Sequence, residues 1–225
     1  MLLAIDTATE ILSIALHDGD ELAAECTLRA GRQHSALLAP LIERVMAQTG
    51  LSNADLEALA VSVGPGSYTG TRIGVALAKG MASPRDLPLV PVTTLETILA
   101  AQALHDDGTP LIATVAAGRN RVIWAEYRCE SAAWVERRAP QISDWSALLA
   151  EYDSPIRLSG DVSAAGLESI RRAREAGAWI ELAPAAQRAR RAGYLAEVAW
   201  GRLREGDAGV FRADRVMPLY MQGPA

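Results

Sequence analysis

Apolar runs separated by short polar turns predict three strands at the start of the chain. The first two runs cover residues 2–6 and 11–18, and the polar residues TATE lie between them. The DGD segment at 18–20 favours a tight turn into a third run at 21–30. Because both connections are short, the three strands are expected to be antiparallel neighbours in one sheet.

Helical periodicity follows, and it alternates with further apolar runs. Apolar residues recur every three or four positions over 34–48, and Gly50 is a natural stop for this helix. A second helix is expected over 70–82, with Thr69 as its N-cap. Two mostly apolar runs flank it and predict buried strands at 56–64 and 87–94.

The second half repeats this order of paired strands followed by helices. HDDGTP at 105–110 is a candidate domain boundary, and paired strands follow around the turn GRN. The later periodic segments predict helices over 143–152, 163–177 and 184–206, the last of them long and amphipathic. We therefore predict an α/β protein with two related lobes, residues 1–104 and 105–225, whose short apolar tail is able to pack back on the first lobe.

Composition and charge narrow the class of protein. Half of the 225 residues are hydrophobic, the net charge is −5 and the pI is about 5.3, which argues against unaided binding of nucleic acid. Six arginines fall on predicted helices and are expected on solvated faces, namely 171, 172, 174, 188, 190 and 191. The two cysteines are far apart, and the first residues resemble neither a signal peptide nor a membrane anchor. We expect a cytoplasmic protein.

The glycine-rich stretch from Ser62 to Gly74 is a candidate phosphate loop. It lies between a strand and a helix start, an arrangement that favours anions. Its spacing nevertheless fits neither GxxxxGK[ST] nor GxGxxG. The alternative is a tight corner, because Gly70, Gly74 and Ala78 form a small-residue stripe that allows a neighbouring backbone to come close.

The polar turn that begins with Asp6 is a second candidate site. A carboxylate at a strand end, with Thr7 and Thr9 beside it, could hold a hydrated metal next to phosphate oxygens. An ordinary polar turn explains the same residues and is favoured by spacing alone. The three histidines at 17, 34 and 105 are scattered, so no metal site is predicted. Ser67 lacks the GxSxG frame of a hydrolase.

Several segments taken together resemble the bacterial TsaB (YeaZ) family. They are LAIDTATEILSIAL, RQHSALLAPLIERV, VSVGPGSYTGTRIGVALAKGMA and LPLVPVTTLET, in this order, followed by WAEY and the terminal PLY. The resemblance covers roughly the first hundred residues closely and the second half more loosely. It implies the actin-like ATPase fold of sugar kinases and chaperone ATPases, with two lobes that each begin with a strand hairpin.

The resemblance also implies a function. TsaB is a non-catalytic partner of the related transferase TsaD, together with TsaE, in making N6-threonylcarbamoyladenosine at position 37 of tRNAs that read ANN codons. On this basis we expect an accessory subunit without a cofactor of its own, which contacts tRNA only through the complex and no membrane. ATP or ADP is expected only in the assembled complex, and the isolated chain could form a homodimer.

The resemblance also indicates the positions at which this chain lacks functional residues that its relatives carry. The transferase carries an HxxxH metal pair where this chain has Thr94 and Ile98, with Glu96 between them, and these two side chains cannot replace imidazoles. An Asp-Ala-Arg-like segment of the family reads Ala-Ala-Gly-Arg here, at 116–119, and so lacks a carboxylate. Both differences weaken the alternative functions. The first alternative is a weak ATPase or phosphotransferase that uses Asp6 and the glycine loop, and the last is a peptidase.

The partner surface of the family is built from the helices at 34–48 and 70–82. We therefore expect the stripe that contains Gly70 and Gly74, or its neighbours Ile73 and Leu77, to lie against the first helix and form the interface. A bulky residue at Gly74 is then expected to abolish binding of TsaD and to leave the circular dichroism spectrum nearly unchanged. The expected interface residues are His34, Leu37, Leu38, Leu41, Gly70, Ile73, Gly74 and Leu77.

Overall fold

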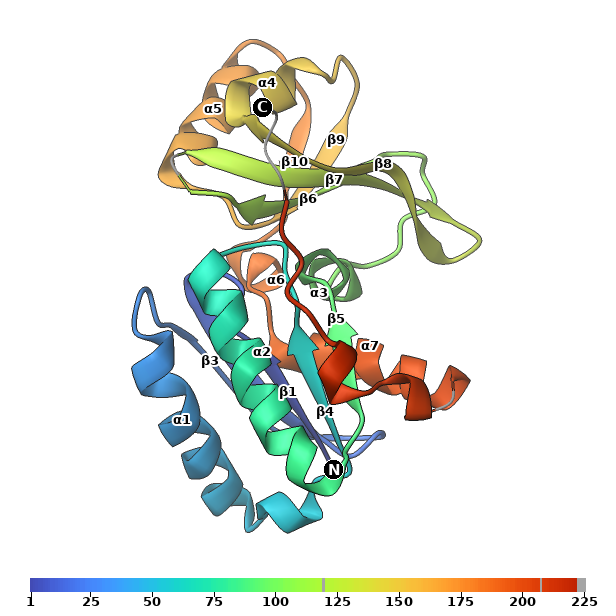
Figure 1. Ribbon diagram of the computed structural model, residues 1–225. Helices are drawn as coiled ribbons and strands as arrows, with labels where there is room; N and C mark the ends of the chain where they lie inside the picture. Colours follow the sequence, from blue (N-terminus) through green and yellow to red (C-terminus); the bar gives the residue numbers. More distant parts are fainter. Residues whose placement is uncertain (119, 207, 222–225) are drawn as a thin grey trace. The chain divides into compact units, whose positions relative to one another are not determined.

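The structure, a computed structural model, describes residues 1–118, 120–206 and 208–221 (Figure 1). The chain forms two compact units, one of residues 1–100 and 190–220, the other of residues 101–189 with Met221. The predicted boundary near residue 105 lies close to residue 101, where the chain first passes from one unit to the other. The assignment of residues 190–213 to the second lobe was wrong, because they belong to the first unit, whereas residues 214–220 of the tail return to the first unit as expected.

The first unit is built on a five-stranded mixed sheet of order β3-β2-β1-β4-β5. β1 (Leu2–Asp6), β2 (Ile11–His17) and β3 (Leu22–Arg29) form the predicted antiparallel meander. β4 (Ala58–Ser62) and β5 (Leu89–Val92) continue the sheet in parallel from β1. The carboxyl ends of the three parallel strands therefore lie at one edge of the sheet, where Asp6 is found.

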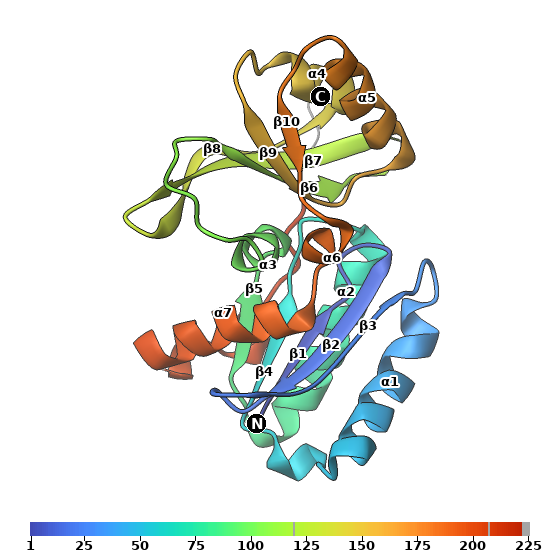
Figure 2. The same cartoon turned by 180° about the vertical axis from the view of Figure 1, so that it is seen from behind.

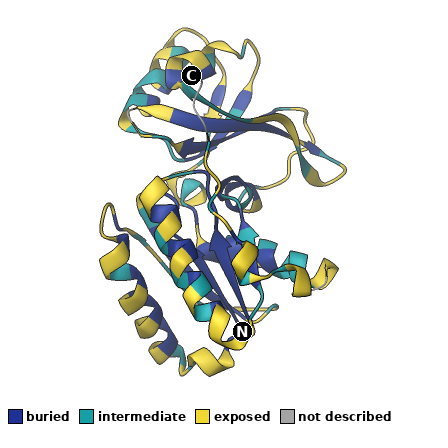
Figure 3. Ribbon diagram, viewed as in Figure 1, coloured by how far each residue is buried: buried dark blue, intermediate teal, exposed yellow. Residues whose placement is uncertain are grey.

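Helices cover both faces of this sheet, and the alternation of side chains along β1 explains why. Leu3 and Ile5 point into a core with α1 (His34–Thr49) and α2 (Tyr68–Ala82), the two helices in front of the sheet in Figure 1. Leu2 and Ala4 point to the opposite face and pack with α7 (Ala192–Glu205), which crosses that face in Figure 2. Figure 3 shows the central strands β1 and β4 as buried, whereas β3 at the edge of the sheet is exposed or half-buried.

The second unit repeats the same topology with sheet order β10-β9-β6-β7-β8. β6 (Leu111–Ala116), β7 (Arg121–Glu130) and β8 (Ala133–Asp144) form the meander, and β9 (Ile156–Gly160) and β10 (Ile180–Leu182) run parallel to β6. The helices that accompany this sheet are α4 (Trp145–Ala150), α5 (Ala164–Glu175) and α6 (Ala185–Arg188). The repeat agrees with the predicted actin-like fold of two related lobes.

Two local predictions differ from the structure. The segment at 184–206 is not one helix, because extended backbone at Ala189 and Arg191 separates α6 from α7. The N-cap of α2 is Ser67 rather than Thr69, since the Ser67 side chain accepts a hydrogen bond from the Gly70 N–H group at 3.1 Å. In addition, β8 was not predicted, because its mostly exposed and half-buried residues show little apolar pattern.

α3 (Thr94–Ala100) follows β5 directly and contacts α7. Of the helices in the described part of the chain, not one combines the length and apolar character needed to cross a membrane.

Candidate functional site

The turn between β1 and β2 places Asp6 in a fully enclosed environment. One carboxylate oxygen, Oδ1, accepts a hydrogen bond from the Ala8 N–H group at 2.8 Å. The other, Oδ2, accepts one from Nε of Arg190 at 3.0 Å, and both side chains have no exposed surface. The carboxylate predicted to hold a metal is therefore already neutralised by a cation of the same chain.

The two threonines of the turn are also engaged. Thr9 accepts a hydrogen bond from the guanidinium group of Arg190, and Thr7 donates one to the carbonyl oxygen of Gly70 at 2.8 Å. The structure thus brings together the three residues predicted as a vestigial nucleotide site. It places them against an arginine and a helix, so the polar-turn interpretation explains their contacts without a ligand.

The glycine loop packs directly on this turn. A Cβ atom at Gly66 would overlap the carbonyl oxygen of Ala8, and one at Gly70 would overlap that of Thr7. At Gly74 it would overlap the Thr7 hydroxyl. The small-residue stripe therefore serves close packing inside the first unit. Of the two alternatives predicted to lie against the helix at 34–48, the stripe itself was wrong, because the β1–β2 turn occupies that face, whereas its neighbours Ile73 and Leu77 pack on the core that α1 shares.

The C-terminal segment closes the other side of the glycine loop. The Leu219 N–H group donates to the Val63 carbonyl oxygen at 2.7 Å, and Gly64, with φ +100°, leaves no room for a side chain beside Leu219. The rings of Tyr68 and Tyr220 lie with their centroids 4.9 Å apart and their planes tilted by 32°. The terminal PLY motif therefore holds the glycine loop in place at the carboxyl end of β4.

The residues at the HxxxH positions have structural contacts. Thr94 is buried, and its hydroxyl donates to the Pro65 carbonyl oxygen at 2.7 Å, while Ile98 is 2% exposed. Oε2 of Glu96 accepts from the Thr93 N–H group at 2.8 Å and so caps the start of α3. These positions tie the glycine loop to α3 and offer no imidazole.

Among the described residues, no three histidine, cysteine, aspartate or glutamate side chains gather as metal ligands could. His34 lies at the start of α1 and is only 4% exposed. Of the second-lobe segment at 116–119 that lacks a carboxylate, Arg119 lies outside the described residues.

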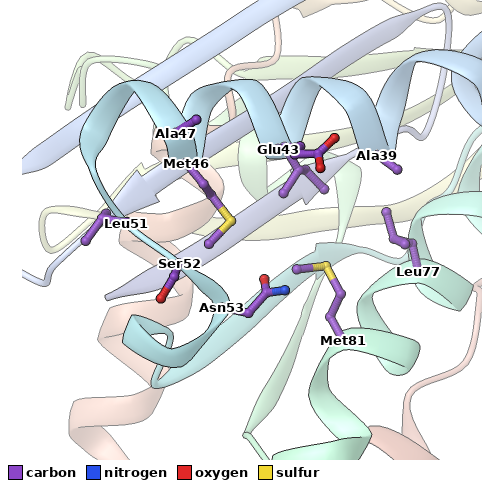
Figure 4. A pocket seen from close by; sticks show the side chains of 10 residues that line it. Ala39, Glu43, Met46, Ala47, Leu51, Ser52, Asn53, Leu77 and Met81 are labelled. Atoms are coloured by element: carbon purple, nitrogen blue, oxygen red, sulfur yellow. The ribbon is translucent and has the colours of Figure 1, made fainter.

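An apolar groove lies between α1 and α2 in the first unit (Figure 4). It has a volume of about 530 Å³, and Leu77 and Met81 of α2 face Met46 of α1 across it. The short segment after α1 closes one end with Leu51, Ser52 and Asn53. The groove carries one acidic side chain, Glu43, and otherwise presents mainly small and apolar groups.

The predicted interface residues divide into two groups around this groove. His34, Leu38, Leu41, Gly70 and Gly74 are buried within the first unit and hold the helices on the sheet. Leu37, Ile73 and Leu77 are half-buried and reach the surface. The exposed positions beside them are small, among them Ala36, Ala39, Pro40, Ala76 and Gly80. The surface that a partner can reach is therefore this second group with its small neighbours.

Arg190 is the site residue that sequence reasoning missed. It was expected on a solvated helix face, yet it is 1% exposed and its side chain is fully buried. Its partner Asp6 lies 184 positions away. The segment ARRAG contains a hint of this role, because two adjacent arginines interrupt the pattern of small and apolar residues over 184–206. The local sequence does not identify which of the two arginines is buried.

Comparison with known proteins now gives this arrangement a context. The family model of the tRNA N6-adenosine threonylcarbamoyltransferase TsaD matches residues 28–210. The tRNA threonylcarbamoyladenosine biosynthesis protein TsaB of Escherichia coli is 38% identical over 134 residues, 59% of this chain and 58% of that protein. TsaB of Bacillus subtilis is 35% identical over 163 residues, 71% of this chain and 70% of that protein. The match therefore spans a little over half of the first relative and more than two thirds of the second.

Solved structures share the fold over nearly the full chain. YeaZ from Pseudomonas aeruginosa superimposes with a TM-score of 0.75 at 23% identity, covering 98% of this chain and 99% of that one. The activator of 2-hydroxyisocaproyl-CoA dehydratase from Clostridium difficile, solved with bound ADPNP, reaches a TM-score of 0.52 at 10% identity, covering 91% and 96%. At these identities the likeness concerns the fold alone.

Proposed function

This chain belongs to the TsaB family, within the wider family of the transferase TsaD, and we propose that it acts as a non-catalytic subunit in tRNA threonylcarbamoyladenosine biosynthesis. In this role it binds TsaD, with TsaE, and is required for modification of adenosine 37 in ANN-decoding tRNAs. It supplies no catalytic residue and no cofactor, and it contacts tRNA through the complex.

One observation carries the non-catalytic role. The carboxylate at the end of β1, which is a candidate for nucleotide chemistry in the sequence, is buried against Arg190. A metal-dependent phosphotransferase needs such a carboxylate open to a hydrated cation. The buried contacts of Thr94 and Ile98, at the positions of the transferase's metal ligands, support the same conclusion.

The docking surface for TsaD is the groove between α1 and α2 with its rim. Two nearly parallel helices with small exposed residues, such as Ala39 and Ala76, let a partner backbone approach closely, and the groove itself receives apolar side chains. Leu77 and Met81 offer adaptable apolar contact at its centre. This chemistry fits an apolar helical surface of a protein partner better than a nucleic acid, which needs cationic side chains.

The test is modification of tRNA in vitro by TsaD and TsaE with this chain omitted and then restored. Modification is expected only when the chain is present. Equal modification without it overturns the scaffold role.

The same preparation, incubated alone with ATP, measures the alternative. An ATPase is expected to release phosphate in proportion to the amount of this chain, whereas a scaffold is expected to release none above background. Release that disappears in an Asp6→Ala variant of equal stability would replace the scaffold proposal with the enzymatic one.

A further inference from the structure

Arg190 is a buried cation at the start of the segment that completes the first unit. Arginine is almost never fully buried without partners, because its desolvation is costly. Here the side chain has no exposed surface and donates from Nε to Asp6 and from a terminal nitrogen to Thr9. The two acceptors come from one turn, so a single planar group bridges them.

The turn holds its acceptors in a fixed orientation. The Ala8 N–H group occupies Oδ1 of Asp6 at 2.8 Å, which leaves Oδ2 directed at the guanidinium group. Asp6 and Thr9 are both buried, at 0% and 6% exposure, so this orientation is protected from water. An acceptor-only carboxylate beside a hydroxyl, set for a planar fork of donors, matches the geometry of guanidinium.

We propose that Asp6 and Thr9 form a guanidinium-binding site at the end of β1, which the chain fills with its own Arg190. The site is built for a planar organic cation. Mg²⁺ instead needs six oxygen ligands at near-octahedral geometry and keeps several waters, and the enclosed turn offers one carboxylate. While Arg190 is docked, Asp6 is closed to a metal-bound nucleotide.

The residues that follow Arg190 keep it in place. The Ala192 N–H group donates to the Ser13 hydroxyl at 2.8 Å, and the Gly193 N–H group donates to Oε1 of Glu25 at 2.8 Å. The free N–H groups at the start of α7 are thus satisfied by β2 and β3 rather than by a local cap. Arg190 is therefore delivered by a helix start that all three meander strands anchor.

The inference goes beyond the proposed function, because it concerns what Asp6 binds in the isolated chain. It is tested by chemical rescue of Arg190→Ala in the full-length protein. The variant leaves a buried carboxylate without its partner, so its melting temperature is expected to fall by on the order of 10 °C. Guanidinium chloride at about 10 mM, far below the molar concentrations that unfold proteins, is then expected to recover a measurable part of that loss.

Two controls isolate the site. Arg191→Ala removes the adjacent arginine, a half-exposed side chain paired with Glu25, and is expected to show little loss and no response to guanidinium. The double variant Asp6→Asn with Arg190→Ala lacks the carboxylate and is expected not to respond. Sodium chloride at the same concentration controls for ionic strength, and MnCl₂ tests for a metal.

An equal response of the wild type, Arg191→Ala and Arg190→Ala overturns the proposal, and so does stabilisation of Arg190→Ala by Mn²⁺ but not by guanidinium. If Arg190→Ala does not fold, the comparison of Arg190→Met with Asp6→Asn/Arg190→Met decides. Removing both charges is expected to recover most of the melting temperature that Arg190→Met loses, and additive losses contradict the pairing. Neither result depends on TsaD or tRNA, so failure here leaves the proposed binding of TsaD standing and removes only the argument from Asp6 for a non-catalytic role.

Discussion

The hydroxyl of Thr7 donates a hydrogen bond to the carbonyl oxygen of Gly70, and the two oxygen atoms lie 2.8 Å apart in a buried contact. This bond joins the β1–β2 turn to the first turn of α2. It explains why Gly70 and Gly74 face inward, since a side chain at either position meets the turn. The partner surface must therefore be sought on the opposite side of the helix.

Gly74→Val is expected to destabilise the fold. The added Cβ overlaps the Thr7 hydroxyl and disturbs its bond to Gly70, so we expect a loss of about 2–4 kcal/mol in the free energy of unfolding. Urea denaturation measures it. Gly80→Ala, on the same helix with nothing within 4 Å, is the control and is expected to be neutral or slightly stabilising. Equal stability of Gly74→Val and wild type would restore the earlier expectation of a free interface glycine.

Ala76→Arg is expected to weaken binding of TsaD without unfolding the chain. Ala76 is exposed on α2 beside the groove, and a long charged side chain there prevents close approach of an apolar partner. We expect at least about a tenfold loss of affinity by titration calorimetry. Leu167→Arg, at an exposed apolar position of α5 in the second unit, is the matched control. Unchanged affinity of Ala76→Arg would move the docking surface elsewhere.

Thr94→Val is expected to cost about 1–3 kcal/mol of stability. The substitution keeps the shape of the side chain but leaves the buried Pro65 carbonyl oxygen without its 2.7 Å donor. Thr94→Ser retains the hydroxyl and is expected to lose less. Thermal unfolding of the two variants measures the difference. A smaller loss in Thr94→Val than in Thr94→Ser would show that packing, not the hydrogen bond, matters at this position.

Tyr152 is expected to resist ionisation at alkaline pH. Burial raises the pKa of its phenol, and the hydrogen bond to Oε2 of Glu126, at 2.9 Å, raises it further. Because the pKa is higher in the folded protein, the contribution to stability is complete below the ordinary tyrosine pKa of about 10 and is lost as the pH rises above it. Ultraviolet titration is expected to detect Tyr152 as a tyrosinate that forms at a higher pH than the other tyrosines.

Tyr152→Phe is the control for that titration, since it removes the late component and leaves the others in place. Glu126→Gln removes the acceptor charge and is expected to shift the late component to lower pH. A titration in which all tyrosines ionise together near pH 10 contradicts the buried Tyr152–Glu126 pair.

The sequence by itself determined the elements whose residues carry a local period. The meander of β1 to β3 and the helices α1 and α2 lie close to their predicted bounds, because burial of one face of an element requires alternating or helically spaced apolar residues. The family resemblance and the repeated order of elements also indicated two lobes. The strand β8 escaped prediction, because an exposed edge strand imposes little apolar pattern.

Tertiary structure alone decided how the candidate site is used. Spacing alone favours a polar turn over a metal site at Asp6 to Thr9, and only the return of the chain 184 positions later brings Arg190 to it. In the same way, the glycine stripe of α2 predicts a close neighbour but not which one. A charged side chain is buried only where another part of the chain supplies an oppositely charged or hydrogen-bonding partner. The local sequence pattern does not indicate which distant residue that partner is.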